Sequence, residues 1–211
     1  MSKNNVIKVT EWVMKKFPFN EDFAEAVGIL CMDANDEAAR IGDHKEVYFQ
    51  KPEGGALSLV NFWIKKWAFQ RGANFTNLAA DIIFDLSTKN KFTDGNKRTA
   101  LLTVLYFFKM SGFWVVQPNP VDYWDKLIEN VVEEFEQSKD PEEIKQKLRE
   151  QILENLVSVD PKYEDVTEET EIDPESEIIT AEYVKSNMRL WQQEVKEDEV
   201  IMESLKRLSV K

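Results

Sequence analysis

Apolar residues at helical spacing run through most of this chain, and they restrict its fold more than any other sequence feature. Upstream of residue 159 they recur three and four positions apart, and no segment keeps the alternation of a half-buried strand for long. Residues 99–110 are apolar on nearly every side, so we expect this helix in the middle of its domain. The sequence predicts an all-α fold for residues 1–158.

The other predicted helices of this domain are amphipathic. They cover residues 21–40, 57–69, 78–89, 123–135 and 141–157, and a short helical start that begins at residue 10 or 11 and ends at residue 16 precedes them. Cys31 lies on the apolar stripe of the first, either Trp63 or Trp67 should point inward from the second, and Asn77 is expected to cap the third. Residues 41–55 contain three glycines and a proline, which predicts an exposed excursion or a small hairpin.

Composition excludes several classes of protein. The 211 residues are 43% hydrophobic, which is ample for one packed core. With one cysteine, Cys31, and one histidine, His44 in the exposed excursion, we expect no disulfide framework and no cysteine-rich zinc site, so any metal would take oxygen ligands. No segment approaches the roughly 18 apolar residues of a membrane span, and polar residues interrupt the N-terminus where a secretory signal would be apolar. We therefore expect a cytoplasmic protein without a membrane partner.

The charge of the chain is concentrated in one segment. The formal net charge of −12 disfavours direct nucleic-acid binding. Between positions 160 and 180, nine acidic residues accompany one lysine, a local balance of −8. Two prolines and few large apolar residues in this segment predict a solvated acidic linker over residues 159–180, with a functional acidic segment as the alternative.

Residues 90–100, NKFTDGNKRTA, place a basic loop containing glycine before the most apolar helix. Backbone N–H groups at a helix start attract phosphate, and Gly95 lets them approach it closely. Arg98 can form a bidentate pair with phosphate oxygens, Lys97 can make a point contact, and Asp94 can hold magnesium together with phosphate and water. The alternative is a simple turn with Asp94 as the helix cap. Two basic residues inside a helix start oppose its dipole, which favours the anion-binding interpretation.

This stretch resembles the signature of the Fic/Doc (Fido) family, in which His-x-Phe-x-Asp/Glu-Gly-Asn is followed by Lys or Gly and then Arg. The matching residues are Phe92, Asp94, Gly95, Asn96, Lys97 and Arg98. The resemblance implies a Fido-type helical bundle over the first part of the chain, with a small flap hairpin or loop at residues 46–55.

The resemblance also implies a set of roles. The phosphates of ATP or another nucleoside triphosphate would be held by Gly95, Asn96, Lys97 and Arg98, and Mg²⁺ by Asp94 with phosphate and water. Family members transfer a nucleotide monophosphate, or in the Doc branch a phosphate, to a hydroxyl of a protein target. They are often restrained by a helix near the phosphate loop, from an antitoxin or from the same chain.

Two positions depart from the family pattern. Leu101 stands where members that transfer AMP have a second arginine, so the chain is closest to the Doc (death-on-curing) branch, and phosphotransfer is the more specific expectation. Asn90 stands where the family has its catalytic histidine. Because a carboxamide can orient a hydroxyl but cannot deprotonate it, we expect the catalytic positions Asn90, Asp94 and Arg98 to form a weak or inactive set. The alternative is a catalytically degenerate Fido protein that acts as a nucleotide- or protein-binding regulatory module.

Residues 181–211 resume helical spacing beyond the linker and are predicted to form a C-terminal amphipathic helix. One face carries Val184, Met188, Trp191, Val195, Met202 and Leu205. Such a face must be buried on this domain or on a neighbouring subunit of a homo-oligomer, and the linker is long enough to reach either. With the resemblance, this segment becomes a candidate restraint.

Overall fold

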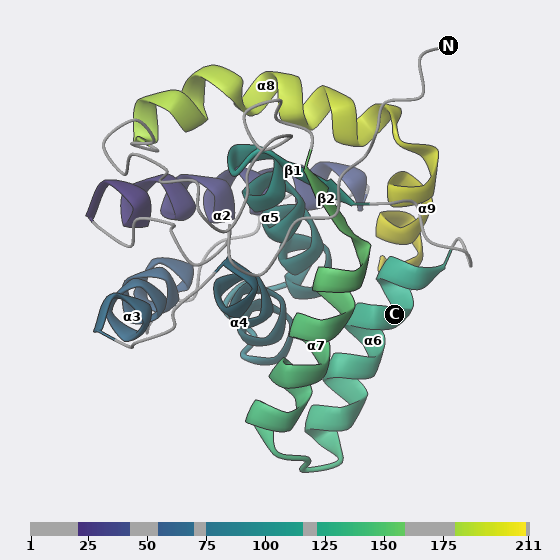
Figure 1. Ribbon diagram of the computed structural model, residues 1–211. Coiled ribbons are helices and arrows are strands. Elements are labelled where there is room, and N and C mark those ends of the chain that lie inside the picture. Colours follow the sequence, from purple (N-terminus) through teal and green to yellow (C-terminus); the bar gives the residue numbers. More distant parts are fainter. Residues whose placement is uncertain (1–20, 43–54, 70–74, 116–121, 159–179, 210–211) are drawn as a thin grey trace.

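The computed structural model describes residues 21–42, 55–69, 75–115, 122–158 and 180–209. Within them the chain is all-α, with eight helices and two strands of three residues each (Figure 1). The predicted helical start that ends at residue 16, His44, almost all of the flap at 46–55, and the linker up to residue 179 lie outside the described residues.

The core is built around α5 (Asn96–Met110), of whose 15 residues 12 are buried. Its central position was predicted from its apolar composition and is confirmed. α2 (Glu21–Ile41) and α4 (Phe75–Thr88) pack against α5. Burial raises the pKa of the Cys31 thiol on α2 to about 12, so Cys31 is a protonated core side chain, as its place on the apolar stripe predicted.

α4 begins at Phe75, so the prediction that Asn77 caps this helix is wrong. The Phe75 ring stacks on Phe107 with 4.5 Å between the ring centroids and meets Phe113 edge-on at 4.9 Å. Each such aromatic pair contributes about 0.5–1.5 kcal/mol beyond the burial of its area. Tertiary packing of one ring thus extends the helix beyond the start that its sequence pattern indicates.

α6 (Tyr123–Glu136) and α7 (Pro141–Asn155) form a helical hairpin (Figure 1). α7 is shorter than predicted, because the chain leaves the helix to form β2 (Leu156–Ser158), which pairs antiparallel with β1 (Phe113–Val115). Leu156 is buried within this pair, so the end of the predicted helix belongs to a strand instead. Among the described residues, β1 and β2 form the only sheet.

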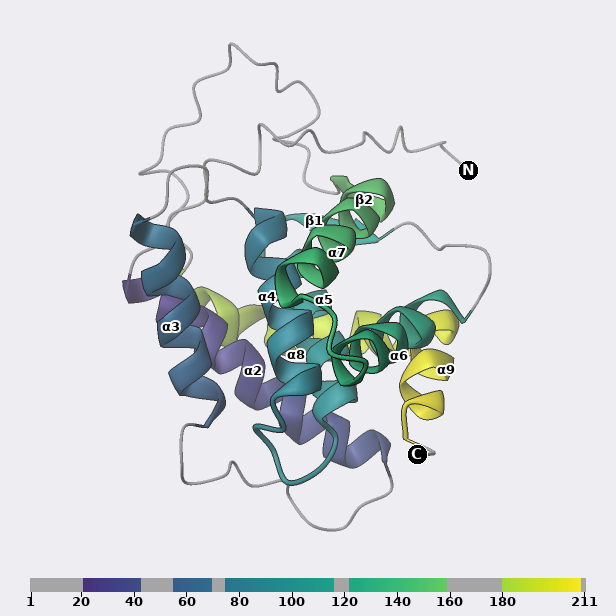
Figure 2. The same ribbon diagram turned by 90° about the horizontal axis from the view of Figure 1, so that it is seen from below.

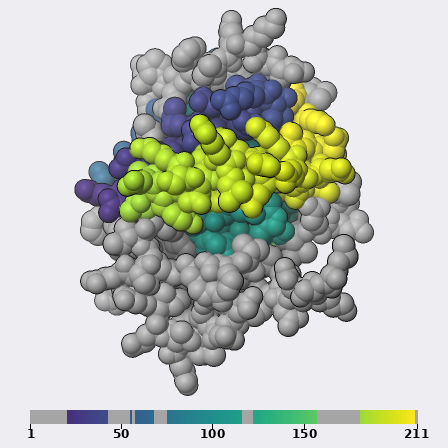
Figure 3. All heavy atoms as spheres, turned by 90° about the horizontal axis from the view of Figure 1, so that it is seen from above, coloured from purple at the N-terminus to yellow at the C-terminus, as the bar shows by residue number. Residues whose placement is uncertain are grey.

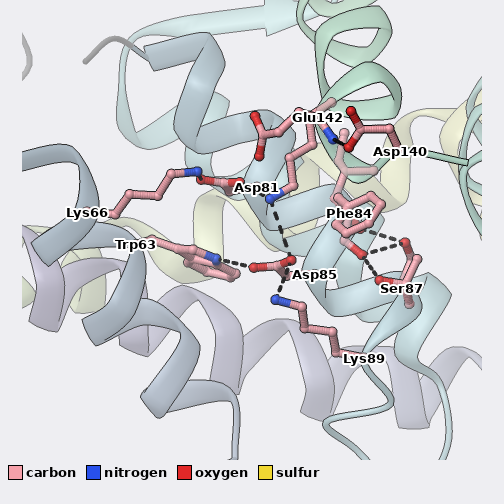
Figure 4. A network of polar contacts seen from close by, with 12 residues as sticks. Trp63, Lys66, Asp81, Phe84, Asp85, Ser87, Lys89, Asp140 and Glu142 are labelled. Carbon is pink, nitrogen blue, oxygen red and sulfur yellow. Dashed lines mark hydrogen bonds and ion pairs between the residues drawn. The ribbon is translucent and has the colours of Figure 1, made fainter. Parts of the chain in front are cut away.

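α3 (Ala56–Phe69) lies at one edge of the molecule in both ribbon views (Figures 1 and 2). Two buried indoles, of Trp63 and Trp67, attach it to α4, whereas only one of them was predicted to point inward. Trp63 Nε1 donates to Asp85 Oδ2 at 2.7 Å, and Trp67 Nε1 donates to Asp81 Oδ2 at 2.6 Å (Figure 4 shows the first pair). Two buried hydrogen bonds between α3 and α4 therefore fix the position of α3.

The C-terminal segment packs on its own domain. α8 (Ala181–Glu197) lies across α2 and α5 (Figure 3), and α9 (Glu199–Arg207) packs on α6. The predicted apolar face is buried except at Met202, which is half-buried. The expectation of one continuous helix is wrong, because Asp198 ends α8 and accepts a hydrogen bond from the Ile201 N–H as the N-cap of α9.

Candidate functional site

The loop before α5 is held in shape by hydrogen bonds of its own. Asn96 Oδ1 accepts from the Phe92 N–H at 2.9 Å, and Asn96 Nδ2 donates to the Phe92 carbonyl at 3.0 Å. The fully buried Phe92 ring anchors the loop to the core. Asn90 and Gly95 adopt left-handed backbone conformations, with φ of 46° and 74°. Glycine adopts this region freely and asparagine tolerates it. In this arrangement both ends of the Asn96 amide serve to build the loop.

The start of α5 is suited to bind an anion. Its N-cap residue is Gly95, which forms no side-chain hydrogen bond to the first turn. The Asp94 carboxylate accepts from the Gly95 N–H, one residue before the helix, so the geometry differs from the simple turn in which Asp94 caps α5. Backbone amides at a helix start and the positive end of the helix dipole together favour a phosphate or carboxylate here.

A cavity of about 480 Å³ lies against this helix start. This volume is within the range of small-molecule sites. Five of the predicted site residues line it: Asn90, Asp94, Gly95, Asn96 and Lys97. The wall is continued by Val132, Phe135 and Glu136 from α6 and by Leu208 from the turn after α9. The structure thus brings the loop of the motif together with segments that are distant in the sequence.

Arg98 is the predicted site residue that does not line the cavity. Its side chain is 2% exposed, and its Nη1 donates to the Ser209 Oγ at 2.6 Å. Gly42, just after α2, is packed so closely on the guanidinium that a Cβ there would lie 2.1 Å from Nη1. A phosphate contact from Arg98 therefore requires this guanidinium to move away from Ser209.

The C-terminal turn that covers Arg98 is itself anchored. Arg207 donates two hydrogen bonds to the Asp125 carboxylate on α6, at 2.8 and 2.9 Å, and this pair raises the pKa of the guanidinium. The Ser209 Oγ in turn donates to the Leu205 carbonyl at 3.0 Å. Two successive contacts therefore hold the end of the described chain over the start of α5.

Among the described residues, no group of three or more His, Cys, Asp or Glu side chains could hold a metal ion. Asp94 is exposed on the cavity wall and could supply one carboxylate. Magnesium commonly takes only one or two carboxylates when phosphates and water complete its shell, so this single acidic residue fits a magnesium–nucleotide complex. Within the same residues, no helix has the length and hydropathy to cross a membrane.

Comparisons of this chain with models of protein families, with curated proteins and with solved structures find no match.

The sequence did not predict the site residues from α6 or from the C-terminal turn, namely Val132, Phe135, Glu136, Leu208 and Ser209. Ser209 is 111 positions from Arg98, and no local pattern connects them. The apolar face of the C-terminal segment indicated that this segment would cover part of the domain. It carried no information about which residues it would cover.

Proposed function

We propose that this protein is a cytoplasmic, toxin-like Fic/Doc-type transferase that is weak or inactive because of Asn90. It would move a phosphate, or a nucleotide monophosphate, from a nucleoside triphosphate to a protein hydroxyl. The observation that carries the proposal is the cavity at the start of α5, lined by Asn90, Asp94, Gly95, Asn96 and Lys97. The second candidate is a nucleotide- or protein-binding regulatory module without turnover. An amide at the position of the family's base favours this candidate.

The loop supports the binding half of this proposal. Backbone N–H groups from Gly95 onward and the half-buried Lys97 provide hydrogen bonds and positive charge for phosphate oxygens. Asp94 would hold Mg²⁺, which, when bound with the nucleotide, neutralises charge on the phosphates. These features bind and orient the nucleotide independently of any proton transfer, so binding should be retained where the chemistry is lost.

The position of Asn90 supports the loss of activity. Asn90 is exposed on the cavity wall, where its amide can hydrogen bond to an incoming hydroxyl but cannot take its proton. Loss of a general base typically costs about 10²–10⁴ in rate. We therefore expect a much faster reaction when a histidine stands at this position.

The C-terminal helices support a role as a restraint within the same chain. In the described arrangement the Arg98 guanidinium donates to Ser209 rather than facing the cavity. Displacement of this turn would break the Arg98–Ser209 hydrogen bond, which opposes a contact of Arg98 with the phosphates. A separate antitoxin remains the alternative source of restraint.

One experiment tests the proposal. The purified protein, its Asn90→His variant and an Asn90→His/Asp94→Asn control are incubated with magnesium, labelled ATP and a cytoplasmic extract. We expect transfer of label from the γ-phosphate by the histidine variant, at least about 100-fold faster than by the parent protein and lost in the control. Transfer from the α-phosphate would replace phosphotransfer by nucleotidyl transfer. Equal labelling by parent and histidine variant would contradict the role of the base, and ATP binding without labelling by any variant would favour the regulatory module.

A further inference from the structure

Phe135, in the last turn of α6, combines exposure with a place on the cavity wall. Its side chain is 38% exposed. Four other large hydrophobic side chains are exposed in the described residues, and none of them lines this cavity: Met32, Phe62, Tyr183 and Leu190. Partial exposure of a ring this large leaves apolar area without cover, so an apolar partner would gain by binding to it.

The Phe135 ring is held in place by the protein core. It meets Phe84 edge-on, with 5.4 Å between centroids and 88° between the ring planes, and Phe84 is 2% exposed. A ring fixed in this way loses little conformational freedom when a ligand binds, which favours affinity. Aromatic side chains held beside a positively charged groove are the surfaces on which nucleobases stack in nucleic-acid-binding proteins.

Charge distinguishes two parts of the cavity wall. The loop contributes Lys97 and the start of α5, both of which favour phosphate, and the Asp94 carboxylate, which would hold Mg²⁺ between itself and the phosphates. α6 contributes apolar side chains and the carboxylate of Glu136, which repels phosphate. A nucleoside triphosphate has the complementary division, with an anionic chain at one end and an uncharged aromatic base at the other.

We infer that Phe135 is the stacking surface for the base of the bound nucleotide, with Val132 and Leu208 as apolar neighbours. This inference rests on the proposed function, because the phosphates must lie against the loop. It adds a determinant for a base-bearing ligand, so ATP should bind more tightly than inorganic tripolyphosphate, which has the same anionic chain and no base. A side chain of the target protein on Phe135 is the competing occupant.

The test is calorimetric titration of the full chain with Mg–ATP and with Mg–tripolyphosphate. We expect Phe135→Leu to weaken ATP binding by about 5- to 100-fold and to leave tripolyphosphate binding unchanged. Phe62→Leu is the matched control, because Phe62 is an exposed phenylalanine on α3, outside this cavity, and it should change neither. Melting curves establish that each variant is folded.

The outcomes separate this inference from the proposed function. If Phe135→Leu binds ATP as tightly as the parent does, the base does not stack on Phe135. If the parent also binds tripolyphosphate, the phosphate site is nevertheless supported. Equal losses for both ligands would also overturn the inference, since the substitution would then act through the fold. If the folded parent binds neither ligand, the phosphate site itself is wrong.

Discussion

At the scale of single residues, Arg98 is the predicted site residue that the structure places outside the cavity. The sequence predicts that Arg98 contacts phosphate. The structure places its side chain beneath the C-terminal turn, where it donates a hydrogen bond to Ser209. A phosphate contact requires the side chain to move, because Arg98 is 2% exposed and does not line the cavity. Competition between Ser209 and phosphate for the same guanidinium would link nucleotide binding to the C-terminus.

Removal of the Ser209 hydroxyl tests this competition. We expect Ser209→Ala to strengthen Mg–ATP binding, and Arg98→Ala in that background to weaken it by roughly 1.5–3 kcal/mol, as for loss of a charge-assisted hydrogen bond. Titration calorimetry measures both, with exposed Ser186→Ala on α8 as the control. If Arg98→Ala leaves the affinity of a folded protein unchanged, Arg98 is a structural residue.

At the scale of helices, α4 carries the polar centre of the molecule. Its Asp81 and Asp85 are almost fully buried and accept the indole N–H groups of α3. Figure 4 shows the bond from Trp63 to Asp85. Lys145 of α7, only 6% exposed, forms an ion pair with Asp81. Two carboxylates one turn apart therefore attach two helices to α4. Lys89 pairs with Asp85 at 2.9 Å from a side chain that is 40% exposed.

The difference in exposure leads to a prediction for stability. Asp81→Ala leaves the Lys145 charge and an indole N–H without their short-range partner in the interior, so the free energy of unfolding should fall by about 3–5 kcal/mol. Lys89→Ala removes a solvated partner and should cost no more than about 1 kcal/mol. Urea denaturation monitored by tryptophan fluorescence measures both. Similar losses for the two variants would contradict this account of the network.

At the scale of the whole molecule, the C-terminal helices form part of the core. α8 covers α2 and α5 with Val184, Met188, Trp191 and Val195, all at most 5% exposed. Ion pairs flank this apolar contact, from Lys109 to Glu194 and from Lys196 to Glu37. The C-terminal helices therefore pack against the rest of the domain.

Two neighbouring residues on α8 provide a matched pair that tests how much this packing stabilises the fold. Trp191 is 5% exposed and Leu190 is 54% exposed. We expect Trp191→Ala to lower the free energy of unfolding by about 3–5 kcal/mol and Leu190→Ala to change it by about 0.5 kcal/mol or less. Chemical denaturation followed by circular dichroism compares them. A small effect of Trp191→Ala would mean that α8 is only loosely attached to the domain in solution.

The periodic distribution of apolar residues determined the all-α class, the central place of α5 and the approximate extent of most helices. This pattern is informative because residues on the buried face of a helix recur at spacings of three and four positions. The residues that shape the loop before α5 could also be identified from the sequence, since Gly95 and the basic residues after it lie within one short stretch. Local geometry and local chemistry are properties of neighbouring residues.

Tertiary structure alone decided the start of α4, the short strand β2 and the partner of Arg98. In each case a contact between distant segments outweighed the local pattern: Phe75 joins an aromatic cluster, Leu156 pairs across a ribbon, and Ser209 meets Arg98 across 111 positions. Such contacts depend on the paths of two segments at once, and the pattern of either segment carries no information about the other. The composition of the cavity, including Phe135, was decided in the same way.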